Sequence, residues 1–398
     1  MTRCFLVLQD GSAFGGISFG APARKADELH QRIDGGRGRG EVVFNTAMCG
    51  YHEMLTDPSY SGQMVVLTYP HAGNYGCNDL WSERGPDDPV MPEIKLGGLL
   101  VRSLYSGPVP GGRVTLDDFL KKNSVPGLSN IDTRSLTLHL RNRGSCNGLI
   151  VAPSQGDSLS EEDLQAAMRC LGEIPSMEGQ NLLSTVGTRV EISFNPSQRP
   201  RFVVVDCGVK GGILRELASR GVGATVLPWS ASLDEILSSS PDGVLFSNGP
   251  GDPATLPSVI ETIRNLLGTI PVFGICLGHQ MIAHALGGRT RKMKFGHHGC
   301  NHPVREERTG RVQVTSQNHG FEVDEEFLPP EVRIWFRNAN DGSVEGLMHD
   351  SLPVMSCQFH PEAAPGPRDS SWVFDEFLRT AAMYAEKKEI MSCLLGAI

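Results

Sequence analysis

Gly274-Ile275-Cys276-Leu277-Gly278-His279-Gln280 places one cysteine between two glycines, where an apolar run changes into a helical pattern. Residues 271–275 are short and apolar like a buried strand, whereas residues 281–286 repeat apolar side chains at helical spacing until Gly287. The stretch therefore predicts a nucleophile elbow with the cysteine at a helix N-terminus. There the unpaired N–H groups and the helix dipole favour a thiolate.

A second element downstream distinguishes Cys276 from the other cysteines of the chain, because a free cysteine is most often just a small buried apolar residue. Phe359-His360-Pro361-Glu362 has a base and a carboxylate two residues apart, and such residues project to the same side at a strand end. Glu362 can then orient His360 as the base. Cys276, His360 and Glu362 together predict a catalytic triad.

The chain from residue 201 onward alternates strand-like and helical patterns. This alternation predicts an α/β domain with a mostly parallel, doubly wound sheet and helices on both faces. Ligands of such sheets bind at the carboxyl ends of the strands, where Cys276 and residues 248–253 fall. A strand-like stretch follows from Gly288, and a final amphipathic helix begins near Trp372. The expected strands and helices before the elbow are 202–205, 213–217, 225–227, 233–237, 244–246 and 259–267.

The N-terminal part of the chain is punctuated by glycine and proline and carries short apolar runs, which predicts a mixed, strand-rich domain. Its one clear helical signal is 133–143, where Leu136 and Leu140 lie four apart and Gly144 follows. A length of 398 residues is too great for one ordinary core.

Residues 153–200 are polar and are expected to connect two domains, at 1–152 and 201–398. Within this connector, Ser160 followed by Asp163 predicts the start of one short helix.

Composition excludes several classes of function. The formal net charge of -9 argues against a nucleic-acid partner, which needs a basic face. No apolar run is long enough to span a membrane, and the run at 4–8 is too short for a signal peptide, so no export is expected. Ten cysteines without framework spacing predict reduced thiols and a cytoplasmic protein.

A metal site deserves a separate test because His297, His298, Cys300 and His302 lie close together. Adjacent histidines on a strand point apart, no second cluster supplies a partner pair, and the spacing matches no standard zinc pattern. We therefore expect no metal. A Rossmann or P-loop phosphate motif is also absent from the sequence, so ATP is expected to bind elsewhere.

The elbow with its Gly-His-Gln tail, the 247–253 loop (Ser-Asn-Gly-Pro-Gly-Asp-Pro) and the His-Pro-Glu element resemble the class I (triad) glutamine amidotransferases. Further motifs resemble the small-subunit family of carbamoyl phosphate synthetases, and they extend this likeness over nearly the whole chain. They are Phe44–Thr46, Gly50–Glu53, Leu55–Tyr60, Leu67–Pro70, Ile131–Arg134, Lys294–Gly299 and Gln317–Phe321. The resemblance implies a flavodoxin-like C-terminal domain.

The resemblance also implies an activity: hydrolysis of L-glutamine through a cysteinyl thioester, with delivery of ammonia to a large subunit. That subunit would hold ATP, magnesium and bicarbonate and make carbamoyl phosphate for arginine and pyrimidine synthesis, so no cofactor is expected in this chain. The N–H groups of Leu277 and of the 249–251 loop would hold the oxyanion. The glutamine-binding residues implied by the matching motifs are Ser59, Gly249, Gly251, Leu277, Gln280, Asn318, Gly320 and Phe321.

Two alternatives stay open: the glutaminase subunit of a different amidotransferase, and a catalytically silent scaffold that only regulates a large chain. The sequence departs from the family pattern at Gly211 and Gly212, where a bulkier residue and an asparagine are expected. Two glycines inside a helix weaken it by about 1 kcal/mol each relative to alanine. Residues 26–40 look like an insertion.

Overall fold

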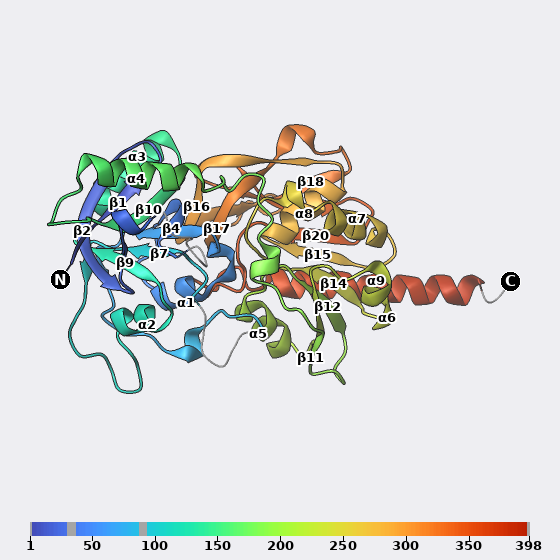
Figure 1. Ribbon diagram of the computed structural model, residues 1–398. Helices are drawn as coiled ribbons and strands as arrows, with labels where there is room; N and C mark the ends of the chain where they lie inside the picture. Colours follow the sequence, from blue (N-terminus) through green and yellow to red (C-terminus); the bar gives the residue numbers. More distant parts are fainter. Residues whose placement is uncertain (1, 30–36, 87–93, 396–398) are drawn as a thin grey trace.

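The computed structural model describes residues 2–29, 37–86 and 94–395. Two sheets, one from each half of the chain, form two domains that lie side by side (Figure 1). The C-terminal helix α9 (Val373–Leu395) begins in the second domain, and its far end projects away from the body of the molecule. Part of the insertion expected at 26–40, residues 30–36, lies outside the described residues.

The first sheet has eight strands in the order β1-β2-β9-β7-β5-β4-β10-β3, and β10 also pairs with β1, so that the sheet closes on itself. The sheet contains both parallel and antiparallel pairs, as the strand-rich, mixed pattern predicts. The strands are β1 (Arg3–Leu8), β2 (Ala13–Gly20), β3 (Arg24–Lys25), β4 (Arg39–Asn45), β5 (Gln63–Leu67), β7 (Gly98–Leu100), β9 (Pro126–Ser129) and β10 (Cys146–Ala152).

Helix α3 (Thr133–Arg143) has the predicted bounds, and its Leu136 and Leu140 are buried against the first sheet. Two further helices, α1 (Tyr51–Thr56) and α2 (Leu116–Lys122), escaped the sequence analysis. The start of α2 carried a readable signal, because the Thr115 side chain accepts the Asp118 N–H as an N-cap. The six residues of α1 are too few to show a helical period.

The connector contains helix α4 (Glu161–Gly172), which starts at the predicted capping box of Ser160 and Asp163. This helix buries Ala167 and Leu171 against strands of the first sheet. Further along, β11 (Ile192–Phe194) is an edge strand of the second sheet and pairs antiparallel with its neighbour there. The connector is therefore divided between the two domains.

The second sheet has ten strands, and its parallel part runs β13-β12-β14-β15-β20. Numbered along the chain this order is 2-1-3-4-5, the flavodoxin-like order, which places ligands at the carboxyl ends of the strands. An antiparallel extension, β19-β17-β16-β18, continues the sheet. Besides β11, the strands are β12 (Arg201–Asp206), β13 (Gly223–Pro228), β14 (Gly243–Phe246), β15 (Val272–Ile275), β16 (Arg289–Glu306), β17 (Val312–Asp324), β18 (Val332–Asn338), β19 (Val344–His349) and β20 (Val354–Cys357).

Helices cover both faces of the parallel strands, which confirms the predicted doubly wound fold. Successive residues of a strand, such as Val203 and Val204, point to opposite faces of the sheet and enter different hydrophobic clusters. One cluster includes apolar residues of α5 (Gly211–Ser219) and α9, and the other those of α6 (Leu233–Ser238), α7 (Pro257–Leu266) and α8 (Leu277–Ala285). No helix in the described ranges is long and apolar enough to cross a membrane.

The long hairpin of β16 and β17 connects the domains (Figure 1). The Thr46 N–H donates to the His298 carbonyl at 3.0 Å, and Lys292 forms an ion pair with Glu41 at 2.9 Å. The residues that follow β4 therefore lie against the strands that carry the second half of the predicted glutamine site.

Candidate active site

Cys276 stands at a sharp turn between β15 and α8, with a φ of 54° that L-residues rarely adopt. Its side chain is buried, and its N–H donates to the Cys357 carbonyl at 2.8 Å. A Cβ on Gly278 would lie 2.0 Å from the Phe246 carbonyl oxygen, so only glycine permits this approach of helix to strand. The turn has the geometry of a nucleophile elbow.

His360 and Glu362 follow β20, the strand next to β15, and are both buried. The His360 Nδ1 atom lies 2.7 Å from Glu362 Oε1. The backbone N–H of His360 donates to the Ser316 carbonyl at 2.9 Å. Glu362 therefore fixes the orientation of the ring and leaves the Nε2 atom free to act on a neighbour.

Charge at this pair favours an imidazolium beside a carboxylate. Burial disfavours the charged imidazole, but Glu362 outweighs it and raises the pKa of His360 to about 10. Burial likewise opposes ionisation of Glu362, yet Lys210 and His360 lower its pKa to about 2. The Cys276 thiol is near enough to add to the raised pKa of His360. These shifts favour a protonated His360 beside an ionised Glu362.

The thiol itself is not aimed at the base in this structure. The Cys276 Sγ donates to the Asn318 carbonyl oxygen at 3.6 Å. Among the described residues, no partner bonds the buried Nε2 atom of His360. The three side chains are therefore brought together, but no hydrogen bond joins the thiol to the imidazole.

One cavity brings most of the sequence-predicted residues together around Cys276, although they come from both domains. Leu277 is not part of its wall and begins α8 directly after the nucleophile. The predicted residues in the wall are Ser59, Gly249, Gly251, Gln280, Asn318, Gly320 and Phe321. Others that the sequence analysis did not name are Gln63, Met177, Pro250, His298 and His319.

Ser59 reaches this cavity from the 3-10 helix η3 (Pro58–Tyr60) of the first domain. Its Oγ accepts a hydrogen bond from Asn248 Nδ2 at 2.8 Å, so the hydroxyl proton is left for a ligand. Asp57 Oδ2 accepts from Asn318 Nδ2 at 3.0 Å. Two buried hydrogen bonds across the domain boundary thus form part of the site.

Two of the predicted binding side chains are used to brace the walls of the cavity. The Asn318 amide bonds Asp57 on one side and lies 2.9 Å from His298 Nδ1 on the other. Gln280 donates its amide hydrogens to the Phe321 carbonyl and to Gln358 Oε1, each at 3.0 Å. Backbone groups on β17 are therefore presented to the cavity at fixed positions.

The connector contributes to the site in a way that the sequence did not indicate. The Asp252 N–H donates to the Gln180 carbonyl at 3.0 Å, and Asp252 Oδ2 accepts the Gly179 N–H at 2.9 Å. These bonds hold the connector over the 249–251 loop, and Met177 closes the wall beside it. No motif marks these residues, because their role depends on how the chain returns between the domains.

Lys210 is a buried cation that the sequence analysis missed. Its Nζ donates to the Ala363 carbonyl at 2.6 Å and lies 3.1 Å from Glu362 Oε1. Burial opposes its charge, but nearby carboxylates including Glu362 raise its pKa above the ordinary value. Lys210 follows β12, beside the point where the strand order reverses between β12 and β14. Ligands of such sheets bind at this point, so its position could have marked it as a site residue.

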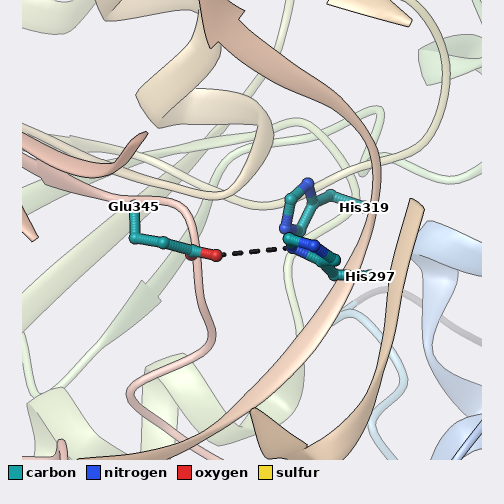
Figure 2. A group of neighbouring side chains, drawn as sticks. All are labelled: His297, His319 and Glu345. Atoms are coloured by element: carbon teal, nitrogen blue, oxygen red, sulfur yellow. Dashed lines mark ion pairs between the residues drawn. The ribbon is translucent and has the colours of Figure 1, made fainter. Parts of the chain in front are cut away.

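The histidines of β16 separate as expected for adjacent strand residues, but His297 gains partners from elsewhere. His319 on β17 and Glu345 on β19 converge on it, as Figure 2 shows. His297 Nε2 lies 2.8 Å from Asp341 Oδ2, and its Nδ1 lies 3.4 Å from Glu345 Oε1. The expectation that no second cluster supplies a partner pair was therefore wrong, because His319 and Glu345 both reach His297.

The charges around His297 favour its protonated form. Burial disfavours the charged ring, but Asp341 and Glu345 raise the pKa of His297 to about 10. Both Glu345 oxygens also accept amide donors at 2.9 Å, from Asn338 and Gln317. His297 and Glu345 thus form a buried imidazolium–carboxylate pair.

Metal removal is accordingly expected to have no effect. Dialysis against EDTA should leave both the melting temperature and glutamine hydrolysis unchanged, because His297 holds a proton between two carboxylates. Elemental analysis before and after dialysis, with a zinc-supplemented sample as control, checks this. Stoichiometric zinc that survives dialysis, or a fall in melting temperature with EDTA, would contradict it.

The comparisons with known proteins agree with this arrangement. Residues 203–380 match the family model described as glutamine amidotransferase class-I. Residues 6–150 match the carbamoyl-phosphate synthase small chain, CPSase domain. The two matched ranges correspond to the two sheets.

Curated relatives align over nearly the full length of the chain. A carbamoyl phosphate synthase small chain of Methanopyrus kandleri is 46% identical over 378 residues, which is 94% of this chain and 98% of the relative. A pyrimidine-specific small chain of Bacillus subtilis is 43% identical over 374 residues and covers 94% of each chain. This protein belongs to the family of carbamoyl phosphate synthase small chains.

Proposed function

We propose that this chain hydrolyses L-glutamine to glutamate and ammonia with Cys276 as nucleophile, His360 as acid and base, and Glu362 as the group that orients His360. The observation that carries the proposal is the elbow cysteine in the wall of a cavity, with the buried 2.7 Å His360–Glu362 pair following the neighbouring strand β20. Ser59 and the 249–251 loop line the same cavity. Release of glutamate from glutamine is the direct test.

The chemistry follows from the weakness of an amide as an electrophile. The Cys276 thiolate attacks the side-chain carboxamide and forms a tetrahedral oxyanion, which the N–H groups of Leu277 and of the 249–251 loop stabilise. The His360 imidazolium then protonates the departing nitrogen, so ammonia leaves and a thioester remains. The neutral imidazole next takes a proton from a water, whose oxygen attacks the thioester; glutamate leaves, and the thiolate and imidazolium are restored. Glu362 stabilises the imidazolium each time it forms.

Ser59, Gln280, Asn318, Gly320 and Phe321 would bind the substrate together with the loop glycines. Backbone groups suit this role, because the side chains of Asn318 and Gln280 are already engaged. Ser59 can donate its hydroxyl proton to the ligand. No cofactor or metal is needed within this chain for any of these steps.

We further propose a large subunit as the partner, which uses the ammonia with ATP, magnesium and bicarbonate to make carbamoyl phosphate for arginine and pyrimidine synthesis. Membership of the small-chain family supports this assignment. The free state of the described cysteines supports a reducing, cytoplasmic location.

The alternatives have less support. A glutaminase subunit of another amidotransferase would leave the match of residues 6–150 unexplained. A silent scaffold would not need the assembled triad. Glutamate release by the complex decides between an active and a silent chain.

Activity is expected to depend on the partner. Glutamine hydrolysis by this chain alone should be weak, because the Cys276 thiol faces the Asn318 carbonyl and not the imidazole. Docking of the substrate-loaded large subunit should select the aligned arrangement. We expect the rate to rise at least about tenfold, equivalent to about 1.4 kcal/mol of barrier.

Glutaminase assays with the chain alone, with the large subunit, and with the large subunit plus ATP and bicarbonate measure this coupling. A large subunit given a non-hydrolysable ATP analogue is the control for docking without turnover. Equal rates in every mixture would disprove the coupling.

A further inference from the structure

A buried carboxylate of the first domain lies behind the triad. Glu83 follows the 3-10 helix η4 (Asp79–Trp81), and its side chain is completely buried. Its N–H donates to Thr56 Oγ1 at 3.0 Å, and the Thr56 hydroxyl lies 3.0 Å from the His52 carbonyl of α1. Glu83 is therefore fixed by the frame of the first domain.

The carboxylate of Glu83 points across the boundary into the second domain. Its Oε2 accepts the Gly212 N–H at the start of α5 at 2.9 Å, and its Oε1 forms an ion pair with Arg215. The same Oε2 lies 3.9 Å from the Nζ of Lys210. A carboxylate at a helix N-terminus is also favoured by the helix dipole.

Lys210 joins this carboxylate to the triad. Its Nζ is 3.1 Å from Glu362 Oε1, the oxygen that also faces His360 Nδ1 at 2.7 Å. Lys210 and His360 therefore compete for one oxygen, and the Lys210 charge lowers the pKa of His360. A second carboxylate beside the ammonium offsets that effect. The buried charges alternate in sign from Glu83 through Lys210 and Glu362 to His360.

One of the two glycines that depart from the family pattern, Gly212, fits this arrangement. A Cβ on Gly212 would lie 2.9 Å from Glu362 Cγ and 2.9 Å from Glu83 Oε2. Only a residue without a side chain lets the start of α5 lie between the two carboxylates. Gly212 thus permits the close spacing of Glu83, Lys210 and Glu362 in this chain.

We propose that Glu83 is a positioning residue of the first domain that holds Lys210, and through it Glu362 and His360, in the arrangement needed for glutamine hydrolysis. This inference rests on the proposed glutaminase function. Glu83 is not in the wall of the glutamine cavity, so it acts on turnover and not on substrate binding. Burial raises the pKa of Glu83 to about 7, while Lys210 and Arg215 oppose the rise. The charge of Glu83 therefore changes with pH near neutrality.

The main test is the isosteric variant Glu83→Gln in the complete complex with the large subunit. Its glutaminase kcat should fall at least about tenfold with KM within about twofold, because only the alignment of the triad changes. The unbalanced Lys210 charge should also lower the pKa of His360, and the alkaline limb of the kcat–pH profile should move down by about 0.5 to 1 pH unit. The groups that face this link are Lys210, Arg215, Glu362, Asp57 and the Gly212 N–H.

Two further variants separate positioning from stability. Glu306→Gln removes another buried carboxylate, bonded to Trp335 and Arg308, and should leave kcat unchanged. Gly212→Ala keeps every charge but forces Glu83 and Glu362 apart, so it should reproduce the fall in kcat. Melting temperatures of all variants report on folding.

A double-mutant cycle tests the route through Lys210. Once Lys210→Met is present, Glu83→Gln should lower kcat no further, because the two residues act as one unit. Additive losses, an unchanged kcat and pH profile in Glu83→Gln, or an equal loss in Glu306→Gln would each overturn the inference. Absence of glutamate release from the wild-type complex would instead contradict the proposed function.

Discussion

Replacement of Cys276 by serine is expected to abolish glutamine-dependent carbamoyl phosphate synthesis, while ammonia-dependent synthesis by the complex continues. A hydroxyl is a far weaker nucleophile than a thiolate at neutral pH, and only the internal source of ammonia is lost. Glutamate release should fall at least about a thousandfold, equivalent to about 4 kcal/mol of barrier. Synthesis from glutamine and from ammonium chloride, measured side by side, provides the test.

Cys170→Ser is the matched control for this variant. Cys170 is also buried, but it lies on α4 against the first sheet, far in the chain from the elbow. It should retain both activities. Loss of both activities in Cys276→Ser would mean that Cys276 is needed for the structure and not for the chemistry.

Replacement of His360 by asparagine is expected to trap the covalent intermediate. Some thiolate still attacks glutamine, but without the imidazole no group activates the water that hydrolyses the thioester. General base catalysis contributes about 10² to 10⁴ in rate, so turnover should fall by that factor. Intact-protein mass spectrometry after incubation with glutamine should detect a glutamyl adduct.

The double variant Cys276→Ser with His360→Asn identifies the site of attachment, since it should carry no adduct. Peptide mapping of the single variant should place the adduct on Cys276. Normal turnover without an adduct in His360→Asn would show that His360 has been assigned the wrong role.

The local sequence was sufficient where neighbouring residues determine the structure. The glycine–cysteine–glycine spacing predicted the elbow, because a strand-to-helix turn needs small residues at those two positions. The spacing of apolar residues likewise located α3, which ends at Gly144, and a capping residue located the start of α4 at Ser160. Both signals act within one turn of the helix end. Alternation of strands and helices predicted the doubly wound sheet, since each segment carries its own apolar face.

Residues that meet only after folding were beyond local patterns. His297 lies beside Glu345, although their neighbours in the chain give no hint of it. The connector looked like a linker by composition, yet Met177 closes the cavity. Ser59 was named only through the family resemblance, because its own sequence context is an ordinary turn.

The sequence by itself determined the class of fold and predicted the nucleophile and the base with its carboxylate, because each depends on spacing within a few residues. The tertiary structure alone decided how the charges behind the triad are arranged. Glu83 and Lys210 come from different domains, and neither carries a motif. Their effect depends on burial and on distances of a few ångströms, since a buried charge is stable only where the fold supplies its partner.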